Sequence, residues 1–551
     1  MIQVNIVILY PYFLLCFFNQ TQILHIKNLV NIMKQISNEK GKLNRREFLA
    51  TTTALGVATV VPRSVLGKGF IPPSDKITLL HIGCGYQGLS EISSLLRCPQ
   101  IEVVGVADPN RQTNDYIGWS VHGLRNSLRR LIDEPNWLEG ITGHPGGRDV
   151  MKNVVETYYK KNRPGWNGTI QAHEDYRELL STMRDVDAVK IIPADHQHSY
   201  MAVDCFKRGK HQIMHKPLGN KLHEAMKVVD MATEQQKIAT HMLAYSASRF
   251  NTIKQAKAWI DAGAIGKLRE IHNWTNRPVW PQYPDIPTER SLIPTGFNWD
   301  LWLGPAQMRE YSPKYTHCCF RGWFEFGAGS IADMGIYSMI PVFNVFGLGS
   351  AVSASTRFSR VVKTNYDLVP SQVVNTWSYP DAAAFRFEIP FKNGNGTVFF
   401  TWHDGGMKPN IPYGYKEDDL PIEGMMFIGE KGAIVGGFYL QNPTLVGLSP
   451  ADEKKYANLK AAPETSEGGR GAQEETPAWL QEWIKNVKGE SKNPGSFEFI
   501  RELTETYNLG AVSLMRNGKK LLYDPATRRV TNDEEGNKLL HRDTRKGWEF
   551  V

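Results

Sequence analysis

The sequence predicts an α/β fold with two domains, and two patterns carry this prediction. Near the start of the folded region, a short apolar run from Ile77 to Ile82 is followed by a glycine-rich turn, an amphipathic segment and a second apolar run. This order is typical of buried parallel strands joined by a helix. Further along the chain, segments that alternate between apolar and polar residues, beginning with 268–275, indicate a second, α+β domain.

The glycine-rich turn fits the pattern G-x-G-x-x-G, with Tyr86 and Gln87 between its last two glycines. Gly83 permits the tight turn, Gly85 lets the backbone approach a pyrophosphate, and Gly88 lets the next helix pack closely on the strand. The N-terminus of that helix then points at the phosphates. The turn and its flanking elements therefore predict a Rossmann domain that binds a dinucleotide through these residues.

The second strand of this unit ends at Asp108, 20 residues after Gly88. A carboxylate at this position accepts hydrogen bonds from both ribose hydroxyls and repels a 2′-phosphate, so NAD is predicted and NADP is less favoured. Arg111, which would accept such a phosphate, keeps NADP as the alternative. A plain βαβ turn explains the glycines but leaves the acid at this distance unexplained.

A twin-arginine export signal is predicted ahead of the folded region. Asn44 to Ala50 (NRREFLA) precedes a mildly apolar run, 49–61, which is too short to span a bilayer. The alternative is an amphipathic helix that begins with two basic residues. Residues 1–70 are therefore assigned to a leader, and the mature protein is expected in the periplasm without a stable membrane span.

A second apolar run, Val4 to Phe18, lies upstream of Met33. We interpret Met33 as the start of translation and the residues before it as untranslated. A genuine membrane anchor is the alternative for this run.

Composition favours an exported two-domain protein. Roughly 480 residues remain after the leader, and several charges of the net +8 lie within it, so nothing suggests binding to nucleic acid. The counts of 14 tryptophans and 21 tyrosines suit stacking on sugars, or a large core. The six cysteines lack zinc-ligand spacing, so we expect no metal site.

The remaining strands of the first domain lead to a lysine. Residues 110–168 form a long insertion of unassigned function, and the buried strand 187–192 is broken by Pro193. The next strand, His211 to Met214, ends at His215-Lys216-Pro217. A lysine at the carboxyl end of a parallel strand lies at the mouth of the crevice where ligands bind. The Rossmann domain is predicted to cover 75–217 and the second domain 218–551.

The order of these motifs resembles a known family. The glycine turn, DAVKIIPADHQHSYMA at 187–202 and GKHQIMHKPL at 209–218 are similar to the Gfo/Idh/MocA family, which includes glucose–fructose oxidoreductase and inositol dehydrogenase. FRGWFEFGAGSIADMGIYSMIPVF at 320–343 and FTWHDGG at 400–406 look like its exported members. The resemblance implies a large, open, mostly antiparallel sheet in the second domain, and a homo-oligomer, either a dimer or a tetramer.

Two departures from the family pattern affect the site. The usual E-K-P is His215-Lys216-Pro217, so Lys216 matches the catalytic lysine while His215 replaces the glutamate. In the D-x-x-x-H helix Asp333 matches, but Tyr337 stands where the family has a histidine base. The resemblance implies that the catalytic residues are Lys216, Asp333, Tyr337 and His198. It implies that Pro193, His198 and Lys216 bind the cofactor together with the glycine turn and Asp108. The residues implied to bind the substrate are His215, Arg277, Trp280, Arg321, Trp323, Asp333 and Tyr337.

The chemistry of these residue types agrees in part. Oxidation of a secondary alcohol needs a group that takes the hydroxyl proton while a hydride leaves to the nicotinamide. Asp333 and Tyr337 are four residues apart and should share one helix face. Tyrosine is a poor base at its free pKa of about 10. His198, His215 and His241 therefore remain alternative bases.

Three functions follow from these patterns. The first is an NAD-dependent oxidoreductase that acts on a secondary hydroxyl of a sugar, polyol or glycoside. The second is a glycoside-cleaving enzyme of the same fold that oxidises, eliminates, hydrates and reduces with tightly bound NAD. The third is a non-catalytic sugar-binding protein, suggested by the departures at 215 and 337.

Overall fold

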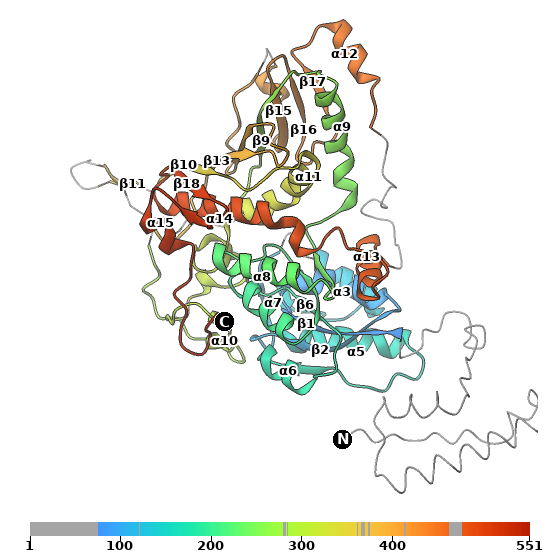
Figure 1. Cartoon of the computed structure of the whole chain (residues 1–551). Coiled ribbons are helices and arrows are strands. Elements are labelled where there is room, and N and C mark those ends of the chain that lie inside the picture. Colours follow the sequence, from blue (N-terminus) through green and yellow to red (C-terminus); the bar gives the residue numbers. More distant parts are fainter. Residues whose placement is uncertain are drawn as a thin grey trace, which may run out of the picture. The chain divides into compact units, whose positions relative to one another are not determined.

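The computed structural model describes residues 75–550, except 119, 121, 279–282, 284, 361, 365–369, 373–374, 413–414 and 462–475 (Figure 1). The twin-arginine stretch, the rest of the leader and Trp280 lie outside the described residues. The described residues fall into one compact unit.

A six-stranded parallel sheet forms the first half of this unit. Its strands lie in the order β5 (Gln171–His173), β2 (Ile101–Ala107), β1 (Ile77–Ile82), β6 (Ala188–Ile191), β7 (His211–Met214) and β8 (Thr240–Met242). This is the Rossmann order, which confirms the predicted fold. The last strand lies beyond residue 217, so the sheet extends past the predicted domain boundary.

Helices cover both faces of this sheet (Figure 1). One face carries α3 (Tyr86–Arg97), α4 (Gly123–Ile132), α5 (Arg148–Asn162) and α13 (Ala478–Val487). The other carries α6 (Tyr176–Thr182), α7 (His198–Lys207) and α8 (Leu222–Glu234). Successive side chains of a strand alternate between faces, so Lys190 and His215 share the α3 face with Ala188 and Ile213.

The insertion after β2 contains a small hairpin. Its strands are β3 (Thr113–Tyr116) and β4 (His144–Gly146), which pair antiparallel, with α4 between them. The hairpin lies against the glycine-rich turn, because the backbone N–H of Gly147 donates to the carbonyl of Cys84 at 2.8 Å.

The second half of the unit is built on a nine-stranded sheet. Its order is β17 (Thr444–Val446), β16 (Ala433–Gly437), β15 (Gly424–Gly429), β9 (Leu268–Trp274), β14 (Thr397–His403), β13 (Ala383–Pro390), β10 (Ser353–Phe358), β18 (Leu521–Asp524) and β19 (Arg529–Val530). Only the β9–β14 pair is parallel among the pairs of this sheet. The mostly antiparallel sheet implied by the family resemblance is confirmed.

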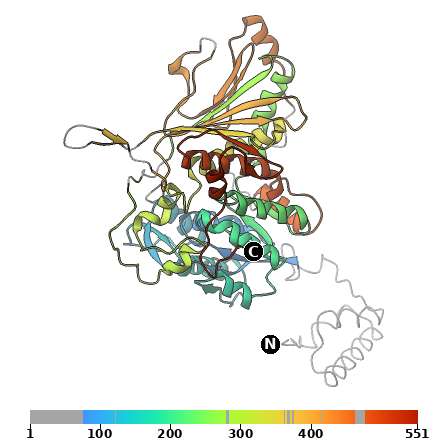
Figure 2. The ribbon, with the colours of Figure 1, turned by 60° about the vertical axis from the view of Figure 1, so that its left-hand side comes forward.

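One face of this sheet is covered by α9 (Phe250–Asp261), α11 (Ile336–Phe346) and α14 (Arg501–Met515). Figure 2 shows the dark-red helix α14 between this sheet and the green helix α8 of the first half. After β12 (Pro370–Gln372), the described residues 375–379 form no regular strand: Asn375 and Trp377 bond to the Tyr283 carbonyl through side-chain N–H groups at 3.1 and 2.9 Å.

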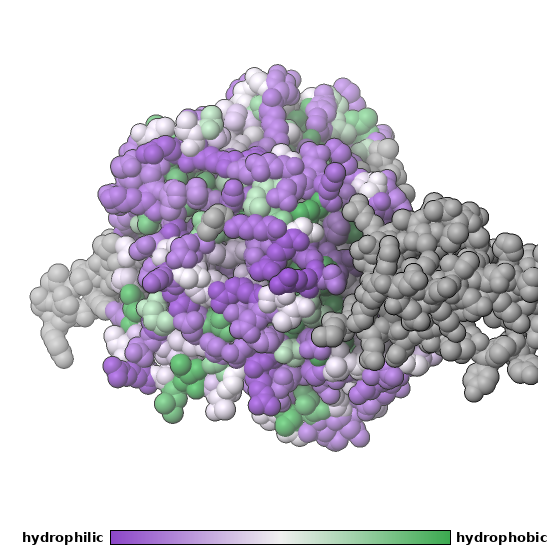
Figure 3. Space-filling model, turned by 60° about the horizontal axis from the view of Figure 1, so that its bottom comes forward, coloured by the Kyte–Doolittle hydropathy of each residue, from purple (hydrophilic) through white to green (hydrophobic). Residues whose placement is uncertain are grey.

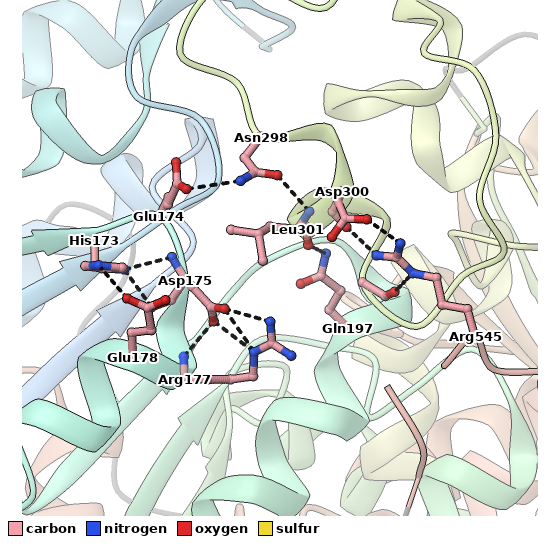
Figure 4. Close-up of polar contacts among 11 residues, drawn as sticks. His173, Glu174, Asp175, Arg177, Glu178, Gln197, Asn298, Asp300, Leu301 and Arg545 are labelled. Carbon is pink, nitrogen blue, oxygen red and sulfur yellow. Dashed lines mark hydrogen bonds and ion pairs between the residues drawn. The ribbon is translucent and has the colours of Figure 1, made fainter. Parts of the chain in front are cut away.

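Side chains join the two halves at the carboxyl edge of the parallel sheet (Figure 4). Asn298, which caps α10 (Trp299–Leu303), donates to Glu174 at 3.1 Å, and Gln197 donates to the Leu301 carbonyl at 3.2 Å. Arg545 of the C-terminal tail bonds Asp300 in turn. The backbone N–H of Arg111 donates to the Gly296 carbonyl at 2.8 Å and that of Asn298 to the Pro109 carbonyl at 3.0 Å, which holds the segment 296–300 beside the residues that follow β2.

The surface view in Figure 3 shows mostly hydrophilic residues, with hydrophobic ones in small separate groups. Within the part of the chain that the structure describes, no helix has the length and apolar character needed to cross a membrane.

Candidate active site

Lys216 follows β7 at the carboxyl edge of the parallel sheet and is 4% exposed. Its ammonium forms a buried ion pair with the carboxylate of Asp333. The Arg321 guanidinium approaches the same carboxylate, with Nε 3.3 Å from Oδ1. The structure thus brings together three residues that lie far apart in the sequence and were all predicted at the site.

Asp333 lies in a single π-helical turn, Ile331–Gly335, which leads into α11. The sequence predicted a regular helix with Asp333 and Tyr337 on one face. A π turn bonds i to i+5 and is frequent at functional sites. Gly335 lies against the ring of Trp402, where an added Cβ would come within 3.2 Å.

Asp333 is an anchoring charge in this arrangement. Burial alone would raise the pKa of its carboxyl, but the Lys216 and Arg321 charges outweigh burial and lower the pKa to about 2. The carboxylate therefore stays ionised at any physiological pH. It holds the ammonium and the guanidinium in place and is a poor acceptor for a substrate proton.

The ring of Tyr337 lies beside the same ammonium. Lys216 Nζ is 5.6 Å from the ring centroid, and the Arg249 guanidinium is 4.9 Å away. Burial, followed by the negative charges of Asp333 and Glu91, raises the pKa of Tyr337 well above its usual range. The phenol is therefore a neutral hydroxyl that can donate a hydrogen bond and pass a proton on.

His215 completes the cluster. Its Nε2 lies 3.5 Å from the Tyr337 hydroxyl and 3.3 Å from the carboxylate of Glu91, and its Nδ1 lies 3.3 Å from the Lys216 carbonyl. The side chain is 5% exposed. Of the three alternative bases, this is the histidine that the structure places next to Tyr337.

The other two histidines have structural contacts. His198 is 1% exposed, with Nδ1 at 2.6 Å from the Pro217 carbonyl and Nε2 at 3.2 Å from the Pro193 carbonyl. It ties together the ends of β6 and β7, and burial lowers its pKa. His241 stacks on Trp479, and burial lowers its pKa to about 4. The prediction of His198 as a catalytic group is therefore not supported.

Trp323 was predicted to contact the substrate, but the structure places it in the core. Its side chain is 1% exposed, its ring stacks on Tyr283 with centroids 4.3 Å apart, and its indole N–H donates to the Lys314 carbonyl. Both the ring face and the N–H are thus occupied by the protein. Arg277 lies just after β9, where its backbone N–H bonds Thr275.

The glycine turn fits a dinucleotide. A Cβ added to Gly83 would collide with the backbone of Ile192 and Pro193, and one added to Gly88 would collide with the Gly83 carbonyl. Both positions therefore need glycine to bring β1, β6 and α3 together. The predicted residue Gln87 donates to Glu91 at 2.7 Å, and Tyr86 packs edge-on against His144.

Asp108 stands at the end of β2 as predicted. Its carboxylate accepts the backbone N–H groups of Cys84 at 2.6 Å and Asn110 at 2.8 Å. Burial raises its pKa, and these two donors act in the opposite direction. Arg111 is paired with Asp149 at 2.9 Å, so the cation that would have received a 2′-phosphate is already engaged.

Sequence reasoning missed Tyr116 of β3. Its ring covers Gly85, where an added Cβ would lie 2.8 Å from the ring. The neighbouring Asp115 pairs with His317 at 3.0 Å, which links the hairpin to the second half of the unit. A dinucleotide laid on the turn must contact or displace this ring.

Comparison with protein families agrees with this architecture. Residues 159–242 match the model described as oxidoreductase family, NAD-binding Rossmann fold, and residues 251–358 match oxidoreductase family, C-terminal alpha/beta domain. Both are models of the Gfo/Idh/MocA family, which confirms the resemblance in the two domains. The glycine turn itself lies outside the matched residues.

Individual relatives are distant in sequence. Levoglucosan dehydrogenase of Pseudarthrobacter phenanthrenivorans is 26% identical over 141 residues, which are 25% of this chain and 35% of that protein. The chain thus aligns with about a third of that relative. Among solved structures, WlbA dehydrogenase from Bordetella pertussis with NADH and UDP-GlcNAcA shares 11% identity over 82% of this chain and 99% of its own, with a TM-score of 0.47. Levoglucosan dehydrogenase with NADH and levoglucosan shares 14% over 81% and 99%, with a TM-score of 0.46.

The fold, the glycine turn and the two family matches identify an NAD-binding Rossmann domain followed by a C-terminal α/β domain, both similar to those of this oxidoreductase family. This confirms the predicted fold class and the predicted NAD cofactor.

Proposed function

We propose that the protein is an NAD-dependent oxidoreductase that acts on a secondary hydroxyl of a sugar, polyol or glycoside. The observation that carries the proposal is the polar cluster at the carboxyl end of β7, where Lys216, Asp333, Arg321, Tyr337 and His215 meet. In open parallel sheets this edge is where ligands bind. The sugar dehydrogenase name of the aligned relative supports the choice of substrate class.

Bound NAD would accept a hydride from the carbon that carries the hydroxyl. Lys216, held by Asp333, donates a hydrogen bond to the substrate oxygen. As the C–H bond breaks, the hydroxyl proton moves to the Tyr337 oxygen while the proton of Tyr337 moves to Nε2 of His215. The product is a ketone, and the released proton rests on the imidazole. Arg321 lies on the same side and can bind a neighbouring hydroxyl.

The test begins with the purified protein. Its NAD content is measured after denaturation, and reduction of NAD is followed with a panel of sugars, polyols and glycosides. The proposal expects turnover of at least one class that is lost in Lys216→Met. A protein that holds NAD and converts no member of the panel would favour the non-catalytic sugar-binding alternative.

A glycoside-cleaving enzyme with retained NAD remains the second candidate. The observation that favours it is the cover over the dinucleotide turn, with Tyr116 on Gly85 and the Asp115–His317 pair beyond it. A cofactor under this cover would exchange slowly and would be regenerated in place. Release of an aglycone without added NAD distinguishes this reaction from a simple dehydrogenase, which needs a fresh oxidant for each turnover.

We further propose that the enzyme is exported through the twin-arginine route and works in the periplasm as a homo-oligomer. The motif at 44–50 supports the route, and the family resemblance supports the assembly. Retained NAD suits a compartment that lacks free dinucleotide.

A further inference from the structure

A second buried ion pair lies behind the active site and has no role in the reaction described so far. Lys190 of β6 is 0% exposed, and its Nζ is 2.9 Å from Glu91 of α3. Removing two charges from water costs free energy that their mutual attraction often fails to recover. Groups of this kind cluster at functional sites. Neither residue belongs to the dinucleotide motif or to the Lys216–Asp333 pair.

The geometry connects this pair to His215. One carboxylate oxygen of Glu91 faces Lys190, while the other accepts from Gln87 at 2.7 Å and lies 3.3 Å from Nε2 of His215. The same Nε2 lies 3.5 Å from the Tyr337 hydroxyl. The imidazole therefore stands between a fixed carboxylate and the hydroxyl that touches the substrate in the proposed reaction.

We propose that Glu91, held by Lys190 and Gln87, is a positioning residue that makes His215 the proton acceptor of the active site. Before proton transfer, the lone pair of Nε2 faces an anion. After transfer, the same edge carries a proton beside that anion. The carboxylate thus disfavours the neutral ring and favours the cation, so it drives the proton from Tyr337 to His215. This inference rests on the proposed oxidoreductase function.

Lys190 keeps the carboxylate of Glu91 ionised. Burial would raise the pKa of Glu91, but the charges of Lys190 and His215 outweigh burial and hold the pKa well below its usual range. The groups that face His215 come from several elements: Glu91 of α3, Lys190 of β6, His198 of α7, Lys216 beside it, Asp333 of the π turn and Tyr337 of α11. Glu91 is the anion nearest to Nε2 among them.

The experiment compares Glu91→Gln with a matched control, Glu102→Gln. Glu102 lies on β2 of the same sheet and pairs with Lys76 at 3.1 Å, away from the cluster. In Glu91→Gln we expect kcat to fall about tenfold or more, with KM and NAD content unchanged. The acidic limb of the kcat–pH profile should move to lower pH by about one unit or more, the scale for losing an opposite charge at this distance. The control should change neither quantity.

A double variant separates positioning from folding. Lys190→Met alone removes the cation that faces Glu91 and should lower the melting temperature. Lys190→Met with Glu91→Gln removes both charges and should recover that stability while keeping the lowered kcat and the shifted profile. If the double variant also regains the wild-type profile, the pair is structural and the inference is wrong.

A readout that needs no substrate keeps the inference testable if no turnover is found. The protonation of His215 can be followed by NMR of histidine-labelled protein, with His215→Ala to assign the signal. Its titration midpoint should lie lower by about one unit or more in Glu91→Gln than in wild type. An unchanged midpoint overturns the inference, whereas a shifted midpoint with no turnover on any carbohydrate overturns only the proposed function.

Discussion

Replacement of Lys216 by methionine separates catalysis from cofactor binding. Methionine keeps the length of the stem and removes the ammonium, which the structure pairs with Asp333. If the ammonium contacts the reacting oxygen, kcat should fall by a factor of about one hundred or more, the scale for a positioned acid–base group. This corresponds to about 2.7 kcal/mol or more of transition-state stabilisation. NAD content should be unchanged, because the glycine turn and Asp108 lie at other strand ends.

The same substitution has a defined cost in stability. Removing one partner of a buried ion pair costs about 3 to 5 kcal/mol when the other charge is left alone. Asp333 keeps Arg321 at 3.3 Å, so we expect about 2 to 3 kcal/mol, still within what a typical domain tolerates. Lys76→Met is the matched control, since Lys76 precedes β1 at the opposite end of the strands and pairs with Glu102.

The assay measures kcat, KM, bound NAD and melting temperature for both variants, and adds Asp333→Asn alone and together with Lys216→Met. Because Asp333 acts by holding Lys216, the losses in kcat should be strongly non-additive. Near-normal turnover of Lys216→Met with NAD bound would refute the site assignment, and His215 would then be the leading catalytic candidate. Additive losses would refute the anchoring role of Asp333.

Four further outcomes are expected. Denatured protein should release NAD(H), and recovery of mainly NADP(H) would contradict the role given to Asp108 at the end of β2. Replacement of Arg45 and Arg46 by lysine should empty the periplasmic fraction, and normal periplasmic levels would contradict the export route. Light scattering at micromolar concentration should show a dimer or tetramer, and a monomer would count against the family analogy. Asp333 has a pKa of about 2 in the folded chain and about 3.9 when unfolded, so it contributes about 2.6 kcal/mol of stability at neutral pH. This contribution is lost as pH falls through about 4 to 2, and denaturation of Asp333→Asn against pH should lack this loss.

Local patterns made the parallel sheet and its glycine turn predictable. β1, α3 and β2 each show the apolar period of their own element within a few residues, and the turn between them needs glycine for steric reasons alone. Lys216 was predictable for the same reason, because the end of a short apolar strand marks the edge where ligands bind. These features depend on residues that are close together in the sequence, so one sequence is enough to predict them.

The rest of the site depends on contacts between distant segments. Glu91 lies in an amphipathic helix, where a carboxylate usually marks the solvent face, and its partner Lys190 lies in the strand DAVKII, predicted from its apolar residues. A lysine within such a run was the available signal, since a buried strand accommodates it only with a counter-charge. For Trp323 the expectation came from the family resemblance, which implied contact with the substrate, whereas Tyr283, 40 residues earlier, covers its ring.

The two departures from the family pattern compensate for each other in space. The chain lacks the histidine on the Asp333 helix and the glutamate before Lys216, and these two departures suggested the non-catalytic alternative. The structure places another imidazole at the site, because Nε2 of His215 lies 3.5 Å from the Tyr337 hydroxyl. It also places a carboxylate there, because Oε1 of Glu91 lies 3.3 Å from Nε2 of His215. A carboxylate, an imidazole and a lysine are therefore all present at the site, although Glu91 and His215 occupy other sequence positions than in the family pattern. This favours an active enzyme over the non-catalytic sugar-binding alternative.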